Sequence, residues 1–597
     1  MNFFNKSPEL PLYKDKHLTP KKSSKIKMLF QGFIASLILY YIYYHFSTPA
    51  TSNWEQAKDE VRTAFLESWH TYEKFGWGTD VFHPKKEQGE NMGPQPLGWM
   101  IVDSIDTLMI MKCDEEVERA KEWIQKDLDY SFDYNVNVFE TTIRMLGGLL
   151  SAFHLSNEDM YLDKAVDLAN ALLGGFDSET GLPYSSVNLK TGTGIPNHVD
   201  NGASSTAEIA TLQLEFKYLS FLTGETMYWE KVERIMKHLE SITPRNGLVP
   251  IYIKPDTGKY QGNLIRLGSR GDSYYEYLLK QYLQTGEFVY YDMYKESLDG
   301  VKKYMTKYSK PSDLLFVGEL EQGLSGPLSN KMDHLVCFYG GLVSLGATGG
   351  LTLKEAKALP SWNEEKQNDF DYGEKLTYSC YKMYKDTPTG LSPEIVVWNT
   401  DGTKAKDFHI KPLDKHNLQR PETVESLFYL YRLTGDEKWR QYGYEIFKNF
   451  IKYSKYVNSQ GDVSYVSLDD MVSIPPKQRD NVESFWWAET LKYLYLLFDD
   501  DNTIPLDKYV FNTEAHPFPR FEMGDLFKTG FVRTKPYLKP RPADDKPKDI
   551  KQIPKAQPVN KPVDEEAKEE IKKDPSIVKE ENKEETKQKL NDILKDQ

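Results

Sequence analysis

Acidic residues stand at several segment junctions of this chain, beside glycine, proline, arginine and aromatic residues. Carboxylates can protonate a glycosidic oxygen and activate water, aromatic faces stack on sugar rings, and arginine orients hydroxyl groups. Together these segments predict a sugar site. They are NVFETTIR (137–144), SRGDSYYEYL (269–278), KMDHLVC (331–337), LSPEIVVWN (391–399), RPETVESL (420–427), ESFWWAETLKY (483–493) and FNTEAHP (511–517).

Each segment also has a purely structural explanation. Glu422, which follows Pro421, fits the first turn of any helix, where an acid complements the helix dipole. Thr513 fits a helix N-cap, and Glu140 fits a buried acid whose hydrogen bonds are satisfied. The chemical interpretation therefore depends on the segments acting together.

The stretches that must position these carboxylates have helical periodicity. Apolar residues recur at intervals of three and four over 54–75, 115–128, 138–155, 161–173 and 207–222. Strand-like runs are few and short, as at 248–253. The pattern predicts an all-α fold.

Four helix–turn–helix junctions resemble one another: HLSNEDMYLDKA (154–165), FLTGETMYWEKV (221–232), LQTGEFVYYDMY (283–294) and RLTGDEKWRQYG (432–443). Each ends one helix at Gly or Asn and starts another. Helical hairpins of this kind can stack into a closed ring or an open superhelical solenoid, and the residues alone leave both arrangements open.

Residues 28–44, MLFQGFIASLILYYIYY, form an uncharged run at the lower limit for a bilayer span. Four lysines between positions 21 and 27 precede it, so the positive-inside rule predicts a single-pass anchor with a cytosolic N-terminus and a lumenal body. A cleaved signal peptide is the alternative. Among the three cysteines one disulfide at most can form, and three pairings are possible.

The formal net charge of -14 excludes the basic balance typical of a nucleic-acid binder. Residues beyond 540 include no aromatic side chain and are rich in charge, which predicts disorder. The predicted parts are a cytosolic basic tail (1–27), a transmembrane anchor (28–44), a stem (45–52), a catalytic domain (53–520), a linker (521–540) and a disordered charged tail with unknown partners (541–597).

In their order along the chain, FETTIR, GDSYYEYLLK, DHLVCF, SPE, RPETVESL, AETLKYLYLLF and FNTEAHP resemble glycoside hydrolase family 47, the class I α-1,2-mannosidases that trim N-linked high-mannose glycans. The resemblance covers about residues 53–520 and implies an (α/α)7 barrel, which favours the ring over the solenoid. It implies hydrolysis, with inversion, of terminal α-1,2-linked mannose from Man9GlcNAc2 N-glycans on glycoproteins, giving a Man8 product.

By the same resemblance, Glu140 is the proton donor, Asp272 a catalytic carboxylate and Glu422 the base that activates water. Inversion requires acid and base carboxyl groups about 6.5 to 9.5 Å apart, with a water between them. Further positions that match the family's pocket are Arg144, Glu276, Asp333, His334, Arg420 and Phe485.

The resemblance also implies a Ca²⁺ ion, which Thr513 would bind through its hydroxyl and carbonyl oxygens. Glu394, Glu425, Glu489 and Glu514 would hold waters on that ion. Ca²⁺ accepts many oxygen ligands at flexible angles, which suits such a site better than the strict octahedron of Mg²⁺.

Arg270 resembles the arginine of the endoplasmic-reticulum-type members, where Golgi-type members carry a smaller apolar residue. An endoplasmic reticulum membrane enzyme that removes one preferred mannose is therefore expected. Cys337 and Cys380 resemble the family's paired cysteines, which leaves Cys113 free. The alternatives are a Golgi-type mannosidase with broader trimming, a degradation-linked glycan-binding member with weak hydrolysis, and a membrane-tethered scaffold acting through its charged tail.

Overall fold

The computed structural model describes residues 53–522, 524 and 527–535. The predicted anchor (28–44), stem and charged tail (541–597) lie outside the described residues. The described residues from 55 to 535 belong to one compact unit.

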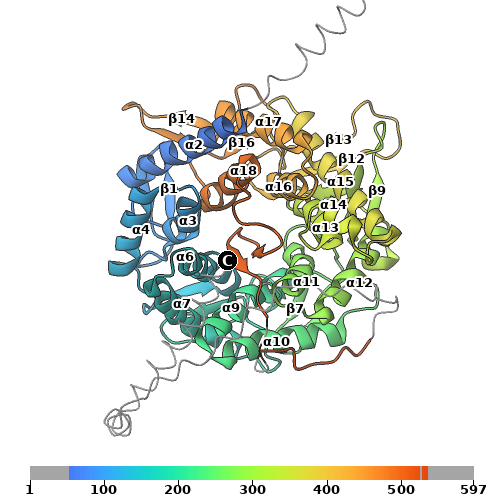
Figure 1. Ribbon diagram of the computed structural model, residues 1–597, viewed down its shortest axis with the longest axis horizontal. Helices are drawn as coiled ribbons and strands as arrows, with labels where there is room; N and C mark the ends of the chain where they lie inside the picture. The colour runs from blue at the N-terminus through green and yellow to red at the C-terminus, as the bar shows by residue number, and fades with distance from the viewer. Residues whose placement is uncertain (1–52, 523, 525–526, 536–597) are drawn as a thin grey trace, which may run out of the picture. The chain divides into compact units, whose positions relative to one another are not determined.

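Helices dominate the described residues and form two concentric layers (Figure 1). The inner layer consists of α3 (Trp99–Ile110), α6 (Gly147–Ser156), α9 (Gln213–Thr223), α11 (Asp272–Thr285), α13 (Phe338–Thr348), α16 (Glu422–Thr434) and α18 (Leu491–Phe498). The outer layer consists of α2 (Trp54–Phe75), α4 (Asp114–Lys126), α7 (Asp159–Leu172), α10 (Thr226–Ile242), α12 (Phe288–Tyr304), α15 (Glu364–Lys385) and α17 (Glu437–Ser454).

The inner helices close on themselves. Each packs against the next along the chain, from α3 to α6, α9, α11, α13, α16 and α18. The circle is completed because α3 also packs against η5 (Trp486–Thr490), the turn that leads into α18. The described helices therefore form a ring rather than an open solenoid.

Left-handed residues end the inner helices at the predicted junctions. Asn157 follows α6, Gly224 follows α9, Gly286 follows α11 and Gly435 follows α16, all with φ between 58° and 74°. Glycine and asparagine adopt this conformation at low cost, so they stop one helix and turn the chain into its outer partner. The predicted recurrence of these junctions is confirmed.

Two predicted helices are interrupted. The expected helix at 138–155 is divided into α5 (Val138–Thr141), the π-helix η1 (Thr142–Leu146) and α6. The expected helix at 207–222 is divided into α8 (Thr206–Ile209) and α9. Hydrophobic periodicity continues across such breaks, which explains why it does not reveal them.

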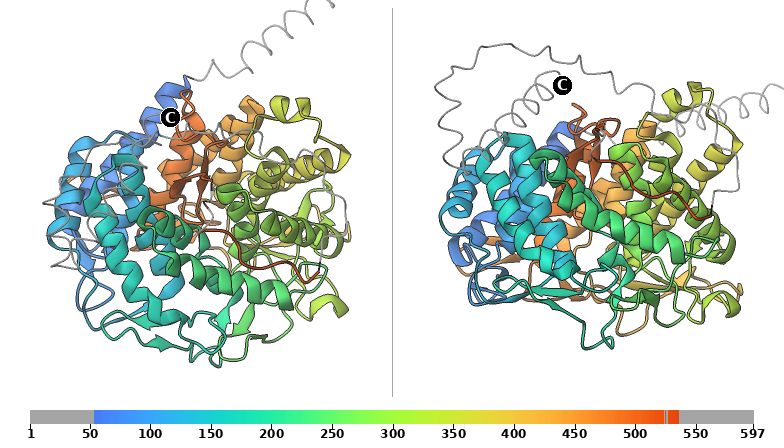
Figure 2. Two further views of the ribbon diagram at one scale, coloured as in Figure 1. Left: turned by 60° about the horizontal axis from the view of Figure 1, so that its bottom comes forward. Right: turned by 90° about the horizontal axis from the view of Figure 1, so that it is seen from below.

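Short antiparallel sheets of two or three strands connect the helices, and Figure 2 shows loops and strands gathered at one end of the ring. They comprise β1 (Val81–His83), β2 (Gln88–Glu90), β3 (Asn135–Asn137), β4 (Ser186–Asn188), β5 (Gly194–Ile195), β6 (Ser204–Ser205), β7 (Tyr252–Lys254), β8 (Lys259–Tyr260), β9 (Thr306–Tyr308), β10 (Leu315–Val317), β11 (Lys331–Asp333), β12 (Ile395–Trp398), β13 (Phe408–His409), β14 (Lys455–Val457), β15 (Val463–Tyr465), β16 (Leu468–Asp470), β17 (Lys477–Gln478), β18 (Tyr509–Phe511) and β19 (Pro517–Pro519). The short helices are η2 (Leu173–Phe176), η3 (Gly323–Ser325), η4 (His334–Cys337) and α14 (Leu353–Ala358).

The β18–β19 hairpin lies inside the ring (Figure 1). Strand β18 packs against α11, and β19 packs against α6. The hairpin pairs Val510 with Phe518, and both side chains are buried. It therefore fills the centre of the ring and presents its turn, residues 512–516, to the surrounding inner helices.

A disulfide joins Cys337 at the end of η4 to Cys380 in α15, and Cys113 is a buried free thiol. Both cysteine predictions are confirmed. Within the described part of the chain, His334–Ala358 is the stretch long and apolar enough to cross a membrane, but most of it is buried among other helices, as expected for a core segment.

The described residues after 520 pack against helices of both layers. Phe521 stacks on Phe221 of α9 at a centroid distance of 4.4 Å. Further along, the Arg533 guanidinium pairs with Glu296 of α12 at 2.7 Å, and the Thr534 amide donates to Glu240 of α10 at 3.1 Å. The described part of the predicted linker thus contacts α9, α10 and α12.

Candidate active site

One pocket with a volume of about 380 Å³ opens where several inner helices begin. Among the residues predicted as functional, those that line this pocket are Glu140, Arg144, Arg270, Asp272, Glu276, Arg420, Glu422, Glu425, Phe485, Glu489, Thr513 and Glu514. The structure therefore brings together residues that are up to 374 positions apart in the sequence, from Glu140 to Glu514.

The three predicted catalytic carboxylates sit in the first turns of helices. Asp272 is the first residue of α11, Glu422 the first residue of α16, and Glu140 lies in the first turn of α5. The Asn137 side chain caps α5 by accepting the Glu140 amide at 2.8 Å. Helix N-termini favour negative charge, so these positions partly offset the cost of burying the acids.

Glu422 is held as a carboxylate. Its Oε2 lies 2.9 Å from Nδ1 of His334, whose Nε2 lies 2.9 Å from the Thr423 hydroxyl and 3.0 Å from the Tyr384 hydroxyl. Burial alone would raise the pKa of Glu422, but the hydrogen bond and charge of His334 and the charge of Arg420 outweigh it and lower that pKa. Glu422 is thus ionised and able to accept a proton from water.

Asp272 has the opposite electrostatics. Burial, together with the negative charges of Glu276 and Glu422, raises the pKa of Asp272 to about 7, although the Ser273 amide hydrogen-bonds its Oδ1 at 2.9 Å. The pocket therefore holds one carboxyl group whose pKa is raised beside another whose pKa is lowered. Opposed pKa shifts of neighbouring carboxyl groups are typical of sites that carry out acid–base chemistry.

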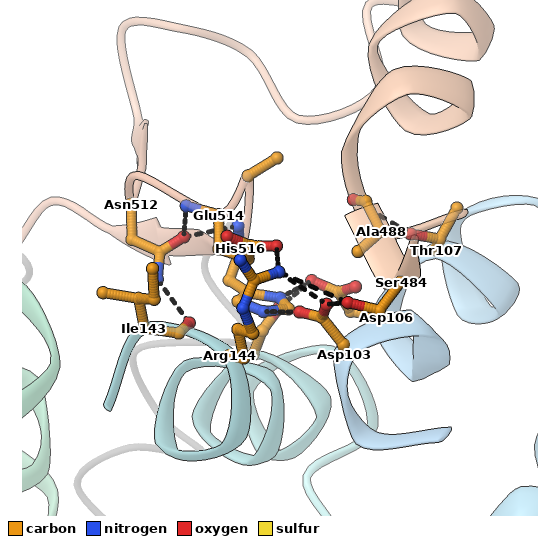
Figure 3. A network of polar contacts seen from close by, with 12 residues as sticks. Asp103, Asp106, Thr107, Ile143, Arg144, Ser484, Ala488, Asn512, Glu514 and His516 are labelled. Carbon is orange, nitrogen blue, oxygen red and sulfur yellow. Dashed lines mark hydrogen bonds and ion pairs between the residues drawn. The ribbon is translucent and has the colours of Figure 1, made fainter. Parts of the chain in front are cut away.

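Arg144 links Glu140 to the hairpin turn. Figure 3 shows Arg144 beside Glu514 of this turn and Asp103. The Nε of Arg144 contacts Glu140 Oε2 at 2.9 Å, and its Nη1 pairs with Glu514 and lies 3.3 Å from Asp103 Oδ2. The guanidinium also lies 5.7 Å from the Phe485 ring centroid. Arg144 therefore fixes the Glu140 carboxylate, which is more exposed than the other acids, against a buried anchor.

The turn that carries Thr513 is fixed by its neighbour Asn512. The Asn512 Oδ1 accepts the amides of Glu514 at 2.9 Å and His516 at 2.8 Å, and its Nδ2 donates to Ile143 O and to Glu215 Oε1. Ala515 has a φ of 61°, which closes the turn. The threonine is consequently presented to the pocket on a rigid support.

Several carboxylates line the pocket together with Thr513. Burial raises the pKa of Glu425 to about 8, with Glu276 and Glu422 adding to the rise against the opposing charge of Lys280. Burial and neighbouring carboxylates also raise the pKa of Glu489 and of Glu514 well above their usual range. Like charges packed this closely favour either protons or a cation between them.

The donor set near Thr513 consists of oxygens, as hard cations prefer. In the described ranges, no three His, Cys, Asp or Glu side chains lie close enough together to hold a metal ion by themselves. A cation here would therefore depend on the Thr513 oxygens and on waters, with the carboxylates one layer further out. The oxygens of Thr513 suit a hard cation such as Ca²⁺. Of the four glutamates predicted to hold waters on it, Glu425, Glu489 and Glu514 line the same pocket as Thr513 and Glu394 does not.

Three predicted pocket residues lie behind the pocket wall instead of lining it. His334 supports Glu422, Glu394 Oε1 accepts from Arg420 Nε at 2.6 Å, and Asp333 Oδ2 accepts the Ser269 amide at 3.3 Å. For Glu394 this means that its carboxylate is committed to Arg420. These residues hold the lining side chains in place.

The sequence interpretation missed several lining residues, including Asn197, Ser205, Glu208 and Ser269. Ser205 and Glu208 form a capping box on α8, and Glu208 Oε1 also accepts Asn137 Nδ2 at 3.0 Å. The S-x-x-E spacing at 205–208 is a signal that predicts the cap, but it does not predict the pocket.

Both π-helices of the described chain contribute to the pocket. The turn η1 carries Arg144, and η5 carries Glu489. A π-turn adds one residue to a helix and shifts the direction of the side chains around it. The other faces of these helices are buried in the ring. The shift lets each helix place one charged residue, Arg144 or Glu489, in the pocket.

A buried group of carboxylates with divergent pKa values, framed by arginine and aromatic side chains, defines the site of a glycoside hydrolase. The sequence pattern of glycosyl hydrolase family 47 matches residues 64–520, and the chain belongs to this family. The fold agrees: an α-1,2-mannosidase from Trichoderma reesei superimposes with a TM-score of 0.70 at 27% identity, covering 78% of this chain and 99% of that one.

Two curated relatives cover most of the chain. A mannosyl-oligosaccharide 1,2-alpha-mannosidase of Candida albicans is 67% identical over 89% of this chain and 97% of its own length. An endoplasmic reticulum mannosyl-oligosaccharide 1,2-alpha-mannosidase of Saccharomyces cerevisiae is 50% identical over 81% of this chain and 93% of its own length.

Proposed function

We propose that this protein is a mannosyl-oligosaccharide 1,2-α-mannosidase that removes terminal α-1,2-linked mannose from high-mannose N-glycans on glycoproteins. The names of its relatives at 50% and 67% identity support this activity. The single structural observation that carries it is the convergence of Glu140, Asp272, Glu422 and Thr513 on one pocket.

In this proposal, Glu422 removes a proton from the attacking water while an acid on the other side of the ring protonates the leaving oxygen. His334 keeps Glu422 ionised, as the base requires. Glu140 donates the proton, and Asp272 supplies a second carboxyl group beside the sugar. A single displacement of this kind inverts the anomeric centre.

Ca²⁺ is the proposed cofactor. Thr513 would hold it through its hydroxyl and carbonyl oxygens, and Glu425, Glu489 and Glu514 would orient its waters. The ion would supply charge that binds the hydroxyls of the terminal mannose and fixes its ring shape. The raised pKa values of these carboxylates support a cation at this position.

The finer architecture is also a proposal. We infer a barrel of seven helix pairs, preceded by a signal anchor at 28–44 and followed by a charged tail. The body would face the lumen of the endoplasmic reticulum as a type II membrane protein, in agreement with the compartment in the name of the yeast relative. A Golgi location remains the alternative.

Substrate preference would depend on Arg270, which lines the pocket. A guanidinium at the pocket mouth can bridge hydroxyls of more than one sugar branch and so restrict removal to one mannose. Arg270→Leu is therefore expected to broaden the Man8 isomer pattern. An unchanged pattern would contradict this assignment.

The experiment that tests the function incubates the full chain with Man9 glycan, with calcium or with a chelator, and reads the products by mass. Loss of one hexose that the chelator abolishes is the expected result. Intact Man9 in the presence of calcium would contradict hydrolysis and favour a glycan-binding role.

A further inference from the structure

The pocket rim beside Arg270 is built by a turn of the chain at 196–202. Asn197 in this turn lines the pocket together with Arg270. Val199, two residues further on, is 89% exposed. A ligand that extends out of the pocket on this side would therefore lie near both the Arg270 guanidinium and this turn.

Arg270 is held in one position by two neighbours. Its Nη1 donates to Asp200 Oδ2 at 2.7 Å, and its guanidinium carbon lies 5.1 Å from the centroid of the Tyr252 ring. The arginine side chain is 39% exposed and that of Asp200 is 14% exposed. Arg270 also has a φ of 73°, an uncommon conformation for a residue other than glycine.

Asp200 is itself fixed before any ligand arrives. Its Oδ2 accepts Asn197 Nδ2 at 2.8 Å, while Asn197 Oδ1 accepts the amides of Val199 at 2.9 Å and of Asp200 at 3.3 Å. The carbonyl of Asp200 accepts Gln261 Nε2 at 3.1 Å. The carboxylate is thus anchored from its own turn and from the strand region beside it.

This arrangement suits a neutral, hydroxyl-rich ligand. Asp200 balances the charge of Arg270, so the pair does not need an anionic ligand. A guanidinium carries five N–H donors in a fixed plane. Within the described part of the chain, Asp200 accepts one of these donors, which leaves most of them for a ligand.

We propose that Asp200 is a positioning residue for branch selection: together with Tyr252 it fixes the Arg270 guanidinium, which binds hydroxyls of a sugar beyond the one that is hydrolysed. The inference rests on the proposed function and adds to it the residues that orient the Arg270 side chain. Without Asp200 the arginine would sample several rotamers, and its contacts with the outer sugar would be lost in part.

The test compares two substrates on the full chain with calcium: α-1,2-mannobiose, which fills only the inner pocket, and Man9, which reaches the rim. We expect Asp200→Asn to lower the ratio of kcat/KM for Man9 to that for mannobiose by about tenfold, mainly through KM. The Man8 product should then become a mixture of isomers.

The matched control is Asp469→Asn. Asp469 also pairs with an arginine, Arg479, at 2.8 Å, and the Arg479 side chain is 40% exposed, but neither residue lines the pocket. This variant should keep the Man9 to mannobiose ratio and a single isomer. Melting temperatures of all variants check that the fold is intact.

Coupling to Arg270 separates a positioning role from a general structural one. If Asp200 acts through Arg270, Asp200→Asn should have no further effect on the ratio in an Arg270→Leu chain. An unchanged ratio in the single variant, an equal loss on both substrates, or independent effects in the double variant would each overturn the inference. If the unmutated chain hydrolysed both substrates but the variants gave one of these results, the inference would fall and the proposed function would stand. If the unmutated chain hydrolysed neither substrate, both would fall.

Discussion

Glu422 and Asp272 have opposite electrostatics although both begin a helix. His334 and Arg420 favour the carboxylate of Glu422, whereas burial and neighbouring acids favour the protonated form of Asp272. The difference arises from the neighbours of each carboxyl group. Glu422 faces the imidazole of His334, whereas Asp272 faces other carboxylates.

Glu422→Gln should lower kcat by about 10² to 10⁴-fold, because the amide cannot accept a proton from water. Steady-state kinetics on mannobiose measure the loss. Glu364→Gln is the control, since Glu364 also lies in the first turn of a helix but is exposed and outside the pocket. Equal kcat values for Glu422→Gln and the unmutated chain would exclude Glu422 as the base.

Stability without calcium should fall as pH rises. The pKa of Asp272 is about 7 and that of Glu425 about 8 in the folded chain, against about 4 in an unfolded one. Between these values the folded state binds protons that the unfolded state has lost, so the stabilisation is complete at low pH and disappears as pH rises through the folded pKa.

Thermal melting in a chelator should therefore show a Tm that declines from about pH 5 to pH 8. Asp272→Asn should reduce the slope, because this group no longer titrates. A Tm that rises over this range in the chelator would contradict the proposed crowding of protonated carboxylates.

The sequence predicted the pocket residues that stand in motifs, but it did not predict the residues whose role depends on contacts made in the fold. Glu140, Asp272 and Glu422 stand in motifs at helix starts, and the pocket contains all three. The supporting roles of His334 for Glu422 and of Glu394 for Arg420 were not foreseen. A sequence motif does not show whether a side chain lines the pocket or contacts a lining residue from behind. Asn197 lies in a turn whose position depends on the whole fold.

At the scale of elements, the β18–β19 hairpin is attached to the inner helices by buried charges (Figure 3). His516 Nδ1 lies 2.8 Å from Asp106 Oδ2, and Lys492 Nζ lies 2.9 Å from Asp106 Oδ1. Lys492 also donates to the carbonyl of Ala515 at 2.7 Å. The turn that carries Thr513 is thereby connected to α3 and α18.

Lys492→Met should destabilise the chain by about 3 to 5 kcal/mol, since it leaves the buried Asp106 without its compensating lysine. Denaturant unfolding measures the loss, and calcium affinity should weaken because the turn at Thr513 loses an anchor. Lys438→Met, at a partly exposed pair, is the control and should change stability little. A stability equal to that of the unmutated chain would show that this attachment is dispensable.

The elements were largely predictable, and their interruptions were not. The outer helix α2 has the bounds that periodicity predicts, and the junctions at Gly224, Gly286 and Gly435 lie where the sequence places them. The π-turns η1 and η5 have no periodic signature. The buried network of Asp106, Lys492 and His516 depends on contacts between segments far apart in the sequence.

At the scale of the whole chain, we expect the helical ring to be sufficient for hydrolysis without the C-terminal tail. The family match ends at residue 520, and every lining residue of the pocket lies before that point. Deleting residues 541–597 should therefore leave kcat/KM on Man9 within about twofold of the unmutated chain, an energy difference below about 0.5 kcal/mol. A large loss on deletion would favour a scaffold role for the tail.

The proposed mechanism requires Glu422 to activate a water on the face of the mannose ring opposite the departing oxygen. Proton NMR of the sugar released in the first minutes of hydrolysis detects this geometry, because the anomer first formed records the direction of attack. We expect β-mannose first, followed by slow equilibration with the α-anomer. Release of α-mannose first would refute attack from that face.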